Sequence, residues 1–192
     1  GHINPPASDK PVLTLSLAAM NKLLHLDRES QIATFGAGTP GPEVESQLRE
    51  QGYMLGHFPQ SWELSTVGGW VASRSSGQQS MRYGRIEQMS AGGRMETPRG
   101  TLEILAIPPP SAGPDIREIV LGSDGRLGVI TEVKVRVTPL PETETFQVAF
   151  APNWDVAVEL VRGLTQARLP LSMLRGSNAE ETRTHLMLSG RE

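Results

Sequence analysis

The segment from Gly122 to Glu132 constrains the fold most, because a glycine-rich turn runs directly into a strand-like sequence. It reads Gly-Ser-Asp-Gly-Arg-Leu-Gly-Val-Ile-Thr-Glu, and residues 133–137 then alternate apolar and charged side chains. Glycines let a backbone approach a ligand closely and turn its N–H groups outward. The segment is therefore either a plain turn before a strand or a loop that binds a phosphate-bearing or flat aromatic cofactor.

A second glycine-rich segment lies upstream, between Gly56 and Gly77. It contains Pro-Gln-Ser-Trp-Glu, Ser-Thr-Val-Gly-Gly-Trp-Val-Ala and Arg-Ser-Ser-Gly, and it is followed in order by Tyr-Gly, Thr-Pro-Arg-Gly, Gly-Pro-Asp and the Gly122 loop. This ordered set resembles the FAD-linked oxidase family, whose FAD-binding domain is of the vanillyl-alcohol oxidase (PCMH) type. The first and third motifs are most similar to the alkyldihydroxyacetonephosphate synthase-like branch. The resemblance covers roughly residues 12–141, and it implies FAD as the cofactor and an α+β fold with a mixed sheet and flanking helices.

The resemblance also implies which residues act. His57 matches a histidine that is counted among the active-site residues of the synthase branch, so a catalytic role follows, either in moving a proton or in polarising a carbonyl. Three segments match positions that contact the flavin dinucleotide. The cofactor-binding residues expected from them are Gln60, Ser61, Trp62, Glu63, Leu64, Ser65, Thr66, Ser73, Arg74, Ser75, Ser76, Asp124, Gly125, Arg126, Leu127, Gly128, Val129 and Ile130.

Most of these residues also have a simpler explanation. Serine and threonine hydroxyls bond to neighbouring backbone in any loop, and a lone histidine is commonly just packed in the protein. Arg74 is either a solvated charge or the partner of a phosphate or a buried carboxylate. Asp124 stands where the family pattern has Glu, but its backbone contacts are expected to survive. Gly125 and Gly128 are expected to offer unobstructed backbone, and Trp70 is expected to anchor the core.

Composition limits the function classes. The 192 residues are 38% hydrophobic and 20% charged, which is typical of a soluble globular chain, and the net charge of -3 argues against a nucleic-acid or anionic-membrane surface. The absence of Cys excludes disulfides, thiolate metal sites and a cysteinyl–flavin link. No metal site is assigned, because His2, His25 and His185 have no partner at metal-ligand spacing. No signal peptide or spanning segment is evident, which favours the cytoplasm, and a homo-oligomer is possible.

The pattern of apolar residues predicts the elements of the cofactor domain. Strands are expected at 11–17, 31–35, 101–105 and 129–137. Helices are expected from Gly41 to before Gly52, as a short turn at 67–73, and at 115–121, where Arg117 and Glu118 should be solvated.

A domain boundary is expected at Leu140–Pro141. Beyond it, the sequence predicts strands at 145–150 and 171–174 and a helix capped by Asn153. We expect residues 1–141 to form an FAD-binding domain that lacks its N-terminal pyrophosphate-loop subdomain. Residues 142–192 are expected to begin a smaller α+β cap or substrate domain, so the chain is expected to be a fragment.

Three functions follow from this reading. The first is an FAD-dependent enzyme that resembles alkyldihydroxyacetonephosphate synthase, in which flavin N5 takes part in exchanging an acyl group for a long-chain alcohol without net redox change. The second is an FAD-linked oxidase or dehydrogenase of a 2-hydroxy acid or alcohol. The third, of another class, is a non-catalytic fragment that binds no cofactor as isolated. The partners implied are FAD and a small-molecule or lipid substrate.

Overall fold

The computed structural model describes residues 9, 11–108, 111 and 113–190. The chain divides into two compact units, Gly1–Leu140 and Pro141–Glu192. Within the described residues, no helix is both long enough and apolar enough to cross a membrane. The two units are described separately below.

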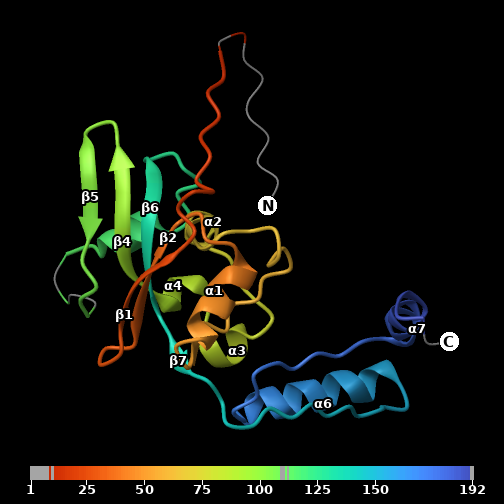
Figure 1. The fold of residues 1–192 in the computed structure, drawn as a ribbon. Coiled ribbons are helices and arrows are strands. Elements are labelled where there is room, and N and C mark those ends of the chain that lie inside the picture. Colours follow the sequence, from red (N-terminus) through yellow and green to blue (C-terminus); the bar gives the residue numbers. More distant parts are fainter. Residues whose placement is uncertain (1–8, 10, 109–110, 112, 191–192) are drawn as a thin grey trace. The chain divides into compact units, whose positions relative to one another are not determined.

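A five-stranded sheet in the order β1-β2-β6-β4-β5 forms the first unit (Figure 1). Every pairing in this sheet is antiparallel. The expected mixed sheet is thus antiparallel in the described residues, because the β1–β2 and β4–β5 hairpins flank the central strand β6, which runs antiparallel to both of its neighbours. The strands are β1 (Leu23–Asp27), β2 (Ile32–Gly36), β4 (Ser90–Thr97), β5 (Gly100–Ile104) and β6 (Val129–Arg136), and a separate pair joins β3 (Tyr53–Met54) to β7 (Thr138–Pro139).

Short helices complete the α+β architecture. The helix α1 (Gly41–Arg49) has Pro42 in its first turn and buries Val44 and Leu48, as predicted. The helix α2 (Val67–Ser73) contacts β2 and β6, and its Trp70 is 2% exposed, which confirms the expected core role of this side chain. The remaining helices of this unit are α3 (Ser80–Tyr83), α4 (Ile86–Met89) and α5 (Ile116–Val120).

The interior strand β4, which lies between β6 and β5, was not predicted from the sequence. It begins Ser-Ala-Gly-Gly, which is typical of a loop rather than of a strand. The structure gives a reason for the glycines, since a Cβ on Gly93 would lie 2.3 Å from the carbonyl oxygen of Glu132 on β6. Close approach of two strand backbones, with register shifts on either side, therefore replaces side-chain packing at this point.

The predicted strand at 11–17 is wrong. Its residues alternate as a strand does, but no described strand pairs with them, and Leu13 is 91% exposed. The strand at this edge of the sheet is instead β1, which pairs with β2 and begins at Leu23, ten residues after Leu13. Alternating apolar and polar residues favour an extended backbone. A β-strand also needs a neighbouring strand to bond to its backbone N–H and carbonyl groups.

The second unit contains two helices, α6 (Trp154–Gln166) and α7 (Ala179–Leu188). Asn153 caps α6 as predicted, because its side-chain oxygen accepts a hydrogen bond from the Val156 backbone at 3.0 Å. The strands predicted at 145–150 and 171–174 are wrong, since both segments are irregular and have no strand partner in the described part of the unit. Phe150 is 91% exposed as a result.

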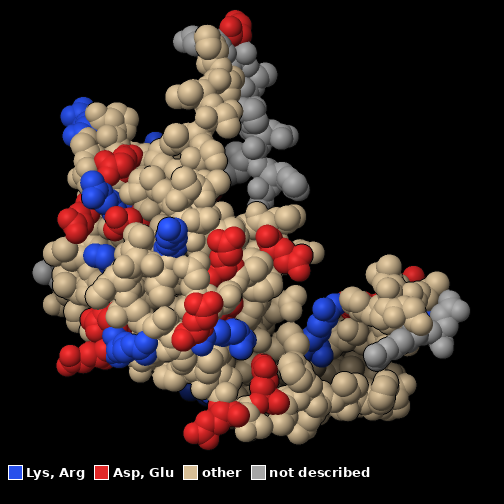
Figure 2. Space-filling view, in the orientation of Figure 1, with Lys and Arg blue, Asp and Glu red and all other residues tan. Residues whose placement is uncertain are grey.

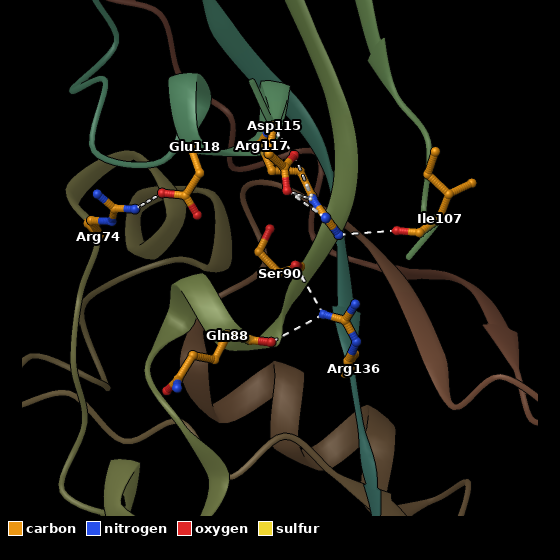
Figure 3. Close-up of polar contacts among 8 residues, drawn as sticks. All are labelled: Arg74, Gln88, Ser90, Ile107, Asp115, Arg117, Glu118 and Arg136. Atoms are coloured by element: carbon orange, nitrogen blue, oxygen red, sulfur yellow. Dashed lines mark hydrogen bonds and ion pairs between the residues drawn. The ribbon is translucent and has the colours of Figure 1, made fainter. Parts of the chain in front are cut away.

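One charged residue of α5, Arg117, differs from the prediction. Arg117 is buried rather than solvated, with an exposed fraction of 7%. Its guanidinium donates to both carboxylate oxygens of Asp115 and to the carbonyl oxygen of Ile107 (Figure 3). On the face shown in Figure 2, acidic and basic side chains are interspersed rather than gathered into one patch of a single sign.

Candidate functional site

The loop before α2 is fixed by hydrogen bonds within itself and to the helix. Thr66 caps α2, since its hydroxyl oxygen accepts a bond from the Gly69 backbone at 3.2 Å. The indole N–H of Trp70 donates to the Ser65 hydroxyl at 2.7 Å, and that hydroxyl donates to the Ser61 carbonyl at 2.8 Å. The hydroxyls of Ser65 and Thr66 therefore have partners inside the protein, as turn chemistry requires.

The start of the same loop is held by Glu45, which the sequence analysis did not identify. This residue of α1 is 5% exposed, and its carboxylate accepts bonds from the backbones of Leu55 at 3.2 Å and Gly56 at 2.8 Å. Burial raises the pKa of Glu45, and the bond from Gly56 opposes that rise. The signal in the sequence was an acidic residue next to Val44 on the apolar stripe of α1.

His57 follows this anchor and is completely buried. Its Nε2 lies 2.7 Å from the hydroxyl oxygen of Ser75, and its ring packs edge-on against Trp70 at 4.9 Å between centroids. Burial lowers the pKa of His57 to about 4, although the charge of Glu87 opposes this shift. The imidazole is therefore neutral at pH 7, and its predicted catalytic role stays a prediction.

Arg74 ends α2 in the left-handed conformation, with φ 54° and ψ 47°. Its guanidinium forms an ion pair with Glu118 on α5, and Figure 3 shows the two side chains pointing toward each other. Both side chains are about half exposed, at 41% and 54%. The partner of Arg74 is thus a carboxylate at the surface rather than a buried one. Glu118 is exposed as predicted, but its pairing with Arg74 was not predicted from the sequence.

The Gly122 loop lies directly against this end of α2. The backbone N–H of Gly122 donates to the Val71 carbonyl at 3.0 Å, and that of Asp124 donates to the Ala72 carbonyl at 2.9 Å. These two bonds bring together the predicted segments 73–76 and 124–130, which are far apart in the chain. The Asp124 N–H is thus used within the protein, and the expected backbone contact of Asp124 with the cofactor stays a prediction.

The two glycines of the third segment differ. A Cβ on Gly125, which has φ 75°, would meet nothing within 4 Å, so this backbone is open as predicted. A Cβ on Gly128 would lie 2.2 Å from the carbonyl oxygen of Glu96, so the expectation of unobstructed backbone there is wrong. Gly128 serves the close contact of β6 with β4, while Ile130 is buried in the core at 8% exposure.

The other predicted cofactor residues lie at the surface or between surface and core. Leu64 is 91% exposed, and the Ser73 hydroxyl donates to the Gly69 carbonyl at 2.8 Å. These residues are accessible from solvent, and they do not surround a closed cavity. Exposed members of the set are Gln60, Ser61, Glu63, Leu64, Ser73, Ser76, Asp124, Gly125, Arg126 and Leu127, and partly exposed members are Trp62, Ser65, Thr66, Arg74, Ser75, Gly128 and Val129.

Three buried polar atoms in or beside these segments have no hydrogen-bond partner: Trp62 Nε1, Arg74 Nε and Ser123 Oγ. Buried polar atoms normally have a partner, so each of these is an unused hydrogen-bonding group. Two are N–H donors, which suit the oxygen acceptors of a phosphate or the edge of a flavin. Together with the open backbone at Gly125, they fit a flavin dinucleotide.

Possible metal-ligating side chains do not cluster in the described residues. Among the residues that the structure describes, no group of three or more His, Asp or Glu is placed to hold a metal ion. His2 lies outside the described residues. The site that the geometry offers is thus one of backbone, hydroxyl and guanidinium groups.

Comparison with known proteins gives the family. The FAD binding domain model matches residues 3–106. The chain belongs to the FAD binding domain family. Its similarity to an alkyldihydroxyacetonephosphate synthase from Dictyostelium discoideum is 38% identity over 95% of this chain and 30% of that protein.

Two further comparisons agree. The chain is 37% identical to an uncharacterized FAD-linked oxidoreductase of Escherichia coli (strain K12), covering 90% of this chain and 36% of the other. A solved alkyldihydroxyacetonephosphate synthase is 46% identical, with a TM-score of 0.64 over 67% of this chain and 23% of that one. The expected FAD-binding fold and cofactor are confirmed, and the chain spans about a third of the length of the curated relatives named here.

Proposed function

We propose that this chain is the FAD-contacting part of an enzyme that acts like alkyldihydroxyacetonephosphate synthase. The observation that carries the proposal is the junction at the end of α2, where backbone bonds from Gly122 and Asp124 to Val71 and Ala72 join two predicted cofactor segments. The similarity to the synthases in sequence and in fold supports the same assignment. In the full enzyme, the substrate would be a lipid or another small molecule.

Each unit has its own role in this proposal. Residues 1–141 form the FAD-binding domain, and residues 142–192 belong to the cap domain that contributes to substrate binding. A cytoplasmic location and a homo-oligomeric state stay predictions.

The residues of the junction bind and orient rather than react. When bound, FAD supplies an isoalloxazine ring whose N5 is the reactive atom. The Arg74 turn and the open backbone at Gly125 provide donors to the dinucleotide. The cap of α2 by Thr66 and the bond of Trp70 to Ser65 keep the preceding loop in one conformation, which lowers the entropy lost on binding.

Titration of the purified chain with FAD tests the proposal. We expect flavin fluorescence to change with saturation, and we expect Arg74→Ala to weaken the affinity by about tenfold, the equivalent of one charge-assisted hydrogen bond. The matched control is Arg162→Ala, because Arg162 also pairs with a nearby carboxylate, Glu159, but belongs to the second unit. Equal affinities for the two variants would remove Arg74 from the site.

Absence of any saturable FAD binding would instead support the non-catalytic fragment. The alternative redox function is favoured by the FAD-linked oxidoreductase relative. It predicts that a 2-hydroxy acid or an alcohol, added without oxygen, bleaches the visible absorbance of the bound flavin. The synthase-like function predicts no net bleaching, because its exchange reaction consumes no electrons.

A further inference from the structure

The side chain of His57, which precedes the predicted cofactor segment 60–66, is hydrogen-bonded to that of Ser75 in the predicted segment 73–76. His57 is 0% exposed, so its ring does not reach a ligand directly. The 2.7 Å contact from Nε2 to the Ser75 hydroxyl is the polar contact of its ring, while Nδ1 is buried without a partner. Any influence of His57 on a ligand must therefore pass through a neighbour.

Because the ring is neutral, only one of its two nitrogens carries a proton and can donate a hydrogen bond. With a pKa of about 4, His57 carries one ring proton at pH 7, and the acidic group facing it, Glu87, does not reverse this. A proton on Nδ1 would leave a buried N–H without an acceptor, which is rarer in proteins than an acceptor left without a donor. The proton therefore lies on Nε2 and is donated to the oxygen of Ser75.

Ser75 has little freedom left. Its backbone N–H donates to the Trp70 carbonyl at 3.0 Å, and its carbonyl accepts a bond from Ile86 at 3.3 Å. Its side chain is only partly buried, and its oxygen already accepts from His57. The hydroxyl proton must then point away from His57.

We propose that His57 is a positioning residue that acts through Ser75, holding the Ser75 hydroxyl as an outward-pointing donor to an acceptor atom of the flavin dinucleotide. This rests on the proposed function of the site. It assigns the side chain of Ser75 to the ligand and removes His57 from direct contact. A serine hydroxyl that is free to rotate loses entropy when it binds, whereas one that is already oriented does not.

NMR of the 192-residue chain tests the orientation without any cofactor. The ring nitrogens of His57, assigned by their loss in His57→Phe, are expected to show a protonated Nε2 and an unprotonated Nδ1 at pH 7. Ser75→Ala is expected to shift the Nε2 signal, and Ser76→Ala, an exposed neighbour, is the control that leaves it unchanged. A protonated Nδ1 would overturn the proposal.

FAD affinity tests the role of the pair. We expect Ser75→Ala to weaken FAD binding by about fivefold to tenfold, as for one hydrogen bond, while Ser75→Thr restores it. We expect His57→Phe to weaken binding only when Ser75 is present, and His57→Gln, which keeps an N–H donor, to weaken it less.

The outcomes separate the two proposals. If the wild-type chain binds FAD and Ser75→Ala binds it equally well, the positioning role is wrong while the proposed function stands. If His57→Phe has the same effect with and without Ser75, His57 does not act through Ser75. If the wild-type chain binds no FAD, the proposed function fails and so does the ligand contact of Ser75.

Discussion

Protonation of His57 should make folding of this protein strongly dependent on pH. The ring is neutral in the folded state because burial lowers its pKa from 6.5 to about 4. In the unfolded chain the ring takes up a proton near pH 6.5, so the unfolded state binds more protons between these two values. Stability from this residue is therefore present above pH 6.5 and is lost as the pH falls toward 4.

The size of the effect follows from the shift. A fall in the pKa from 6.5 to about 4 corresponds to roughly 3 kcal/mol of unfolding free energy lost once the pH is below both values. Between pH 7 and pH 5, integration of the same relation gives a loss of about 2 kcal/mol. This contribution is well above the error of a denaturation experiment.

Urea denaturation at pH 7 and pH 5, followed by tryptophan fluorescence, measures this loss. The protein would carry Trp154→Phe, so that the signal comes from Trp62 and Trp70 in the first unit. His57→Gln cannot take up the proton, and the wild type should lose about 2 kcal/mol more than this variant. Carboxylates contribute equally to both proteins. Parallel pH dependence in the two would refute the claim that His57 is buried and neutral.

Four substitutions test the packing of the site by the same denaturation assay at pH 7. Gly128→Ala places a Cβ 2.2 Å from a backbone oxygen of β4, so we expect a loss of about 1–3 kcal/mol, whereas Gly125→Ala, in open space, should lose only about 1 kcal/mol through its left-handed φ. Thr66→Ala removes the α2 cap and should cost about 1 kcal/mol. Trp70→Phe removes the bond to Ser65 and part of a buried ring, and a loss below about 1 kcal/mol would contradict its role as the anchor.

Local signals predicted the elements that their own residues specify. Pro42 and the apolar spacing of Val44 and Leu48 were sufficient for α1, and Asn153 was sufficient for the start of α6. The strand β4 was missed because Gly93 is explained only by the backbone of the neighbouring strand. The strand expected at 11–17 was wrong for the converse reason, since its alternation is complete but no described strand pairs with it.

The candidate site, too, could be predicted only in part from local sequence. Its segments were identified by their order in the sequence, but what holds them together comes from distant residues. Glu45 fixes the start of the His57 loop from another helix, and Glu118 holds Arg74 across a gap of 44 positions. Neither residue stands out locally, because each looks like an ordinary acidic residue on a helix.

Attachment of the Gly122 loop to α2 by main-chain groups has a consequence for sequence change. Bonds from Gly122 and Asp124 to Val71 and Ala72 use only peptide N–H and carbonyl groups, so no side-chain group at position 124 takes part in them. The left-handed φ of 50° at Asp124 restricts this position only by disfavouring β-branched residues. Exchanges between Asp and Glu there should be tolerated, while insertion or deletion of a single residue would displace both bonds at once. Among related sequences, the number of residues in this loop should therefore vary less than the identity of its side chains. A substitution at position 124 can change the contact with a ligand without moving the loop.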